Sequence, residues 1–105
     1  MNKSEQIREL IKYLEIIQER PKFHFGDTVP PVVNFLWGFH LACYALGLAT
    51  ERDQLYNSVQ SEHGWEINAM HPAGKMQEAG LNQEEVIHEL LAMELETWRK
   101  VYDEL

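Results

Sequence analysis

The stretch from residue 30 to residue 46 constrains the fold more than any other part of the chain. It begins with Pro30 and Pro31, which suit the first turn of a helix because no backbone N–H is needed there. Apolar and aromatic residues then cover nearly the whole helical surface: Val32, Val33, Phe35, Leu36, Trp37, Phe39, Leu41, Ala42 and Tyr44. A helix that is apolar nearly all round is normally buried. We therefore predict that residues 30–46 form the central helix of the domain.

Helical patterns also flank this segment. Residues 4–19 carry an apolar stripe at the i, i+3, i+4, i+7 spacing, with Ser4 as the expected cap. Arg20 precedes Pro21 and should end this helix, because the residue before a proline avoids the α region. A turn over residues 21–28 then leads to the central helix, which Gly47 should end.

The second half of the chain predicts two more helices and an irregular segment. Thr50 should cap a helix over 51–61, and Asn82 with Glu85 resembles the capping box that opens a last helix. The glycines and proline of residues 62–80 indicate irregular structure with one helical turn at 73–78. The predicted fold is all-α, a single domain of residues 1–105: an irregular bundle of four to five helices around a buried central helix (about 30–46).

The charge balance restricts the classes of partner. The chain has 17 acidic and 9 basic residues and a formal net charge of −8. This balance argues against nucleic acid and against an anionic membrane surface, since both require clustered Lys and Arg. The charge is compatible with a basic protein as partner. The single cysteine, Cys43, can form no intrachain disulfide and lies in the apolar segment, which favours a buried inert thiol and a cytoplasmic protein.

Residues with catalytic or metal-binding chemistry do not form a recognisable motif. Of the five histidines, only His88 stands in a Glu-x-x-His pattern, whereas di-metal bundles need two such motifs. His40, on an apolar face, is interpreted as a hydrogen-bonded core histidine. We predict no catalytic residue, no metal and no cofactor. A small metal-dependent enzyme using His and Glu of the 60–88 region remains the less favoured alternative.

Acidic residues of the last helix predict a docking surface for a basic protein. Trp65 adds an aromatic anchor if it is exposed. The favoured interpretation is that Trp65 is buried and holds its loop against the core as a plug. The alternative for the whole set is an ordinary solvated helix face. The candidate partner-binding residues, chosen as surface positions without a motif, are Glu62, Trp65, Glu66, Glu85, Glu89, Glu94, Glu96 and Asp103.

Two short motifs resemble a known family. They are Arg20-Pro21-Lys22-Phe23-His24-Phe25-Gly26 and Phe35-Leu36-Trp37-Gly38-Phe39. Over about residues 10–47 the chain resembles small all-helical bacterial immunity proteins of contact-dependent growth inhibition and related toxin systems, with their Arg-Pro-x-Met-Tyr-x-Gly turn and Phe-Leu-x-Gly-Tyr helix. It departs from this pattern at three positions, where aromatic residues stand in for Met or Tyr: Phe23, His24 and Phe39.

The resemblance implies an antidote without enzymatic activity. Such a protein binds the toxic domain of a delivered effector and occludes its active site, and many such toxins are basic nucleases, with a ribonuclease favoured here. The free protein is expected to be a monomer or a weak dimer. The alternatives are a helical regulatory or scaffolding module, or a homodimer built on the last helix.

Overall fold

The computed structural model describes residues 2–48, 52–65 and 71–105. These residues form six helices and no strand, which confirms the predicted all-α class. The helices are α1 (Lys3–Glu19), α2 (Pro21–Phe25), α3 (Pro30–Ala45), α4 (Arg52–Glu62), α5 (Pro72–Glu78) and α6 (Gln83–Asp103). In the described part of the chain, no helix is long and apolar enough to cross a lipid bilayer.

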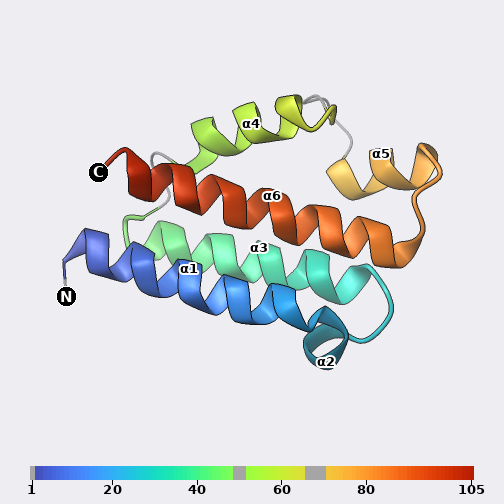
Figure 1. The fold of residues 1–105 in the computed structure, drawn as a ribbon, viewed down its shortest axis with the longest axis horizontal. Coiled ribbons are helices and arrows are strands. Elements are labelled where there is room, and N and C mark those ends of the chain that lie inside the picture. The colour runs from blue at the N-terminus through green and yellow to red at the C-terminus, as the bar shows by residue number, and fades with distance from the viewer. Residues whose placement is uncertain (1, 49–51, 66–70) are drawn as a thin grey trace.

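Helix α6 occupies the centre of the bundle. Figure 1 shows α1 and α3 on one side of it and α4 and α5 on the other. Ten of its side chains are buried, against only three of α3. The prediction that helix 30–46 is the buried centre is therefore wrong, although the helix itself is present at Pro30–Ala45. The reason is that α6 packs against α1, α4 and α5, whereas one side of α3, with Trp37 and Leu41, faces solvent.

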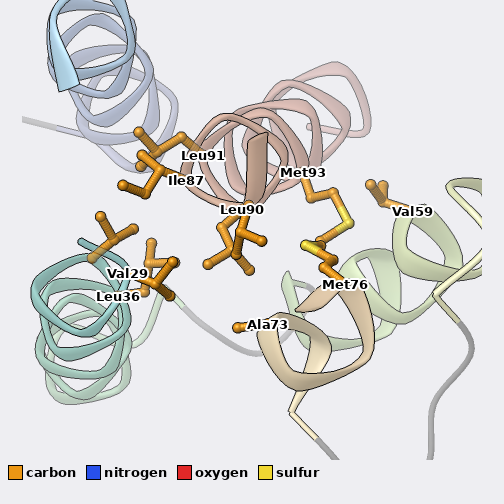
Figure 2. Close-up of a cluster of buried hydrophobic side chains, with 11 residues drawn as sticks. Val29, Leu36, Val59, Ala73, Met76, Ile87, Leu90, Leu91 and Met93 are labelled. Atoms are coloured by element: carbon orange, nitrogen blue, oxygen red, sulfur yellow. The ribbon is translucent and has the colours of Figure 1, made fainter. Parts of the chain in front are cut away.

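The core has two parts along α6. Around its first half, Leu90 lies between α3 and α5, and Met93 points toward Met76 of α5 (Figure 2). Around its second half, Trp98 packs with Ile7 and Leu14 of α1. Each large apolar side chain buried in this way contributes about 1.5–3 kcal/mol. Both parts of the core therefore fix α6 as the element around which the other helices assemble.

Helix ends follow local signals in most cases. Asn82 and Glu85 form the predicted capping box at 2.9 Å in both directions. Gly47 ends α3 with φ of +72°, and the N–H of Leu48 donates to the Cys43 carbonyl at 2.9 Å, as in a Schellman motif. Helix α5 confirms the helical turn expected near 73–78.

Two of the expected local features differ from the structure. Asn2, not Ser4, caps α1, because its side chain accepts the N–H of Glu5 at 2.9 Å. Residues 21–25 form a short helix within the predicted turn. The predicted cap Thr50 lies outside the described residues.

Candidate functional site

A groove of about 1140 Å³ lies where the end of α1 and α2 meet the first turns of α6. It combines one exposed aromatic side chain with several carboxylates. The lining residues are Gln18, Glu19, Arg20, Pro21, Lys22, Phe23, Gly26, Asp27, Leu81, Asn82, Glu84, Glu85, Ile87, His88 and Glu89. Two of the predicted docking residues, Glu85 and Glu89, are brought together here.

The Arg-Pro motif builds one wall of this groove. Pro21 starts α2 directly after α1, and Gly26 ends it with φ of +75°, a conformation that favours glycine. The two phenylalanines of α2 then have opposite roles. Phe25 packs against Phe35 of α3 with ring centroids 5.3 Å apart. Phe23 stays 82% exposed beside the groove. The motif therefore anchors α2 with one ring and presents the other to solvent.

Carboxylates dominate the charge of the groove. Five acidic residues line it, against two cationic ones. Lys22 is already engaged, because its Nζ lies 3.2 Å from Asp27. Glu85 is partly engaged as well, since it accepts the N–H of Asn82 in the capping box. Glu84 is exposed and lines the groove. The groove thus presents net negative charge around an apolar ring.

Glu94, predicted to bind a partner, is instead buried, with 1% of its surface exposed. Its carboxylate accepts from Arg52 Nη2 at 2.6 Å, from Trp98 Nε1 at 2.8 Å, and lies 2.9 Å from His40 Nε2. We call these four residues the Glu94 cluster. Burial alone raises the pKa of Glu94, but the His40 hydrogen bond and the Arg52 charge outweigh it and lower the pKa. Its placement on the docking surface is therefore wrong, whereas His40 is the hydrogen-bonded histidine that was predicted.

Glu89 and Glu96 are half-buried and share one histidine. His63, next to the end of α4, places Nδ1 2.7 Å from Glu89 and Nε2 2.7 Å from Glu96. Both nitrogens can donate only when the ring is protonated. Burial lowers the pKa of His63, but the hydrogen bonds to Glu96 and Glu89 outweigh it and raise the pKa. We call these three residues the His63 cluster. Because both ring nitrogens are occupied, the cluster offers no free nitrogen for proton transfer to a substrate.

The remaining predicted residues do not join the groove. Glu62, the last residue of α4, forms an ion pair of 3.2 Å with Lys100 in the last turn of α6. Asp103 lines a shallow second pocket of about 230 Å³ near the C-terminal end of α6. Trp65 is partly buried and packs against the core, which confirms its favoured interpretation as a loop plug. Glu66 lies outside the described residues.

Groups with nucleophilic or metal-binding chemistry are held in inert surroundings. Burial raises the pKa of the Cys43 thiol to about 11, so this buried thiol stays protonated at neutral pH. Among the described residues, no group of three His, Cys, Asp or Glu side chains is arranged to hold a metal ion. The groove, in contrast, is open to a partner, and its acidic residues and Phe23 determine which partners fit it.

Arg52, His63 and Phe23 are the residues of these sites that sequence reasoning missed. The contact of Arg52 with Glu94 joins positions 42 residues apart, and that of His63 with Glu96 positions 33 apart, so no local pattern marks them. Phe23 could have been singled out, because it belongs to the quoted motif. Comparisons of the chain with models of known protein families, with curated proteins and with solved structures found no match.

Proposed function

We propose that this chain is a cytoplasmic immunity protein that binds a basic toxin domain, with a ribonuclease favoured, through the groove between α2 and α6. The resemblance of the Arg-Pro motif to such proteins motivates the proposal, and the groove gives that motif a place to act. The single observation that carries it is the exposed Phe23 in a groove that carboxylates line.

Phe23 has the properties of an interface anchor. A phenylalanine that is 82% exposed contributes little to the core, while its neighbour Phe25 already fixes α2 to α3. Aromatic side chains in the centre of an interface, ringed by polar groups, account for much of the binding free energy of many complexes. In this proposal Phe23 enters a pocket of the toxin domain, and water is excluded around it.

The carboxylates supply the complementary charge. A nuclease cleft is basic because it holds phosphates, and carboxylates placed at its mouth compete with the nucleic acid for the same cations. Glu84 and Glu89 lie on one wall of the groove and Glu19 on the other. The proposed surface therefore keeps Glu85 and Glu89 from the sequence prediction and omits Glu94. It adds Glu19 of α1, Asp27 after α2 and Glu84 of α6.

The test is co-purification with the product of the adjacent upstream reading frame, followed by calorimetry and an assay of the toxic activity of that product. We expect nanomolar or tighter binding that weakens with salt, with inhibition at a fixed stoichiometry. Phe23→Ala should weaken binding at least about 10-fold, as removal of a hot-spot side chain does. Glu84→Lys should weaken it mainly by slowing association.

Glu78→Lys provides the matched control. It makes the same charge change at an exposed position of α5 that does not line the groove. Binding should stay within about 2-fold of the wild type for this variant, because salt screens an exposed charge that does not contact the partner. Absence of binding to any basic neighbouring domain, or equal effects of Glu84→Lys and Glu78→Lys, contradicts the proposal.

A further inference from the structure

Helix α3 turns a stripe of large apolar side chains toward solvent. Trp37, Leu41 and Tyr44 are 68%, 55% and 56% exposed, and their spacing of four and three residues puts them on one side of the helix. Large apolar surface of this kind, exposed in one place, marks an interaction site more often than chance exposure does. We call the exposed side of this helix the α3 face: Pro30, Pro31, Asn34, Trp37, Gly38, Leu41, Ala42, Tyr44 and Ala45.

The α3 face carries no formal charge, although the protein as a whole has a charge of −8. Residues 28–50 contain no Asp, Glu, Lys or Arg. At the edge of the face, Asp53 accepts a hydrogen bond from Tyr44 and is paired with Arg52 at 3.0 Å. Two copies of this acidic chain can therefore meet through the α3 face without placing acid against acid. A basic partner would find no carboxylate to pair with across the face itself.

A membrane surface fits the α3 face less well. Helices that lie in a lipid interface are rich in Lys and Arg on their polar side, where they attract anionic lipids. Helix α3 has neither residue. The absence of cations therefore favours another neutral protein surface as the occupant.

Gly38 gives an independent indication of close approach from outside the chain. It is exposed near the midpoint of α3, where glycine is the poorest helix former after proline. The fold itself does not require it: φ is not positive, and an added Cβ would meet nothing within 4 Å. A helix crossing over this point would use the missing side chain, because the distance between two packed helices depends on the side chains at their contact.

We propose that a second copy of this chain packs on the α3 face, with the two α3 helices crossing at Gly38 about a two-fold axis. In such an interface each residue near the axis meets its counterpart, so the smallest residue lies at the crossing point. Trp37 and Leu41 of each copy are then buried against the other copy. This dimer uses a different surface from the groove between α2 and α6, and differs from the dimer on the last helix considered from sequence.

Sedimentation equilibrium of the full chain, from about 1 µM to about 1 mM, tests the dimer directly. We expect a concentration-dependent dimer. Leu41→Glu should raise its dissociation constant by about 100-fold or more, because each dimer contains the substitution twice and buries two like charges. Leu105→Glu is the matched control, since Leu105 is also 55% exposed and lies at the C-terminus. It should leave the dissociation constant unchanged within about 2-fold.

Gly38→Ala separates a packing role from a folding role. It should weaken the dimer about 10-fold by adding two methyl groups at the crossing point. In the monomeric Leu41→Glu background the same change should raise Tm by about 4 °C, because alanine is the better helix former. Three results overturn the proposal: a monomer over the whole concentration range, a dimer unaffected by Leu41→Glu, or binding of the monomer to phosphatidylcholine vesicles that Leu41→Glu abolishes.

Discussion

Two clusters of charge hold α6 to the helices around it, and they differ in burial and in their basic group. In the Glu94 cluster Glu94, Arg52 and Trp98 are almost completely buried, and Arg52 carries a charge at every accessible pH. The His63 cluster lies at the surface, where the side chains of His63 and Glu89 are 26% and 28% exposed. Its histidine can lose the charge near neutral pH.

The difference shows that the number of hydrogen bonds does not determine how much a charge pair contributes to the free energy of unfolding. Glu94 and the pair Glu89 and Glu96 all have partners within 2.9 Å. In the buried cluster the loss of Glu94 leaves Arg52 with Asp53 as its only carboxylate partner and with little access to water. In the surface cluster water replaces the lost partner. We therefore expect the Glu94 cluster to be required for stability and the His63 cluster to make stability depend on pH.

The largest expected effect comes from breaking the buried cluster. Glu94→Leu leaves Arg52 charged in the core and removes the acceptor of Trp98 Nε1, so the free energy of unfolding should fall by about 3–5 kcal/mol. Urea denaturation followed by circular dichroism measures this change. Glu96→Leu, the same substitution two residues further along α6, is the control and should cost less than about 1 kcal/mol.

A double variant sharpens the interpretation of this result. Glu94→Leu combined with Arg52→Met removes both charges, so part of the stability lost in Glu94→Leu should return. If Arg52→Met lowers the free energy of unfolding by the same amount in the Glu94→Leu background as in the wild type, the two residues act independently. The description of a coupled buried pair would then be wrong.

The contrast between α3 and α6 explains which parts of the fold were predictable. Helices and their ends depend on neighbours in the sequence. Pro30 and Pro31 predict the start of α3, and the Asn82–Glu85 capping box predicts the start of α6, and the structure confirms both. The position of a helix in the bundle depends on what covers it. The apolar composition of α3 indicated a central helix, yet nothing in the described chain covers Trp37 or Leu41.

The candidate site was predictable to the same limited degree. The acidic character of α6 is a property of composition, so Glu85 and Glu89 could be proposed before the structure was known. Glu94 has the same composition signal, and only its contact with Arg52, 42 residues away, shows that it is buried. The opposing wall of the groove, with Phe23, comes from α2 and required the tertiary arrangement.

The His63 cluster should make stability depend on pH. The pKa of His63 in the folded protein is raised above the value of about 6.5 expected when unfolded. Its stabilising effect is therefore complete below about pH 6.5 and is lost as the pH rises through the folded pKa. Thermal unfolding between about pH 5.5 and pH 9 should show this decline in the wild type, and His63→Gln should reduce it.

His88→Gln is the control for this experiment. His88 lies on the same helix but is exposed in the groove, away from the His63 cluster. The variant should keep the pH dependence of the wild type. A wild-type stability that rises between pH 6.5 and pH 9, or a decline equally steep in His63→Gln, would show that the imidazolium contact does not stabilise the fold.

The smallest effect is expected where both members of a pair are exposed. Arg99 of α6 donates to Glu15 of α1 at 2.9 Å, and the two side chains are 54% and 51% exposed. Because water solvates both partners, their coupling energy in a double-mutant cycle with Arg99→Ala and Glu15→Ala should be below about 1 kcal/mol and should decrease in salt. A coupling as large as that between Glu94 and Arg52 would mean that burial does not set the strength of these pairs, since both are Arg–Glu pairs that join α6 to another helix and they differ in their access to water.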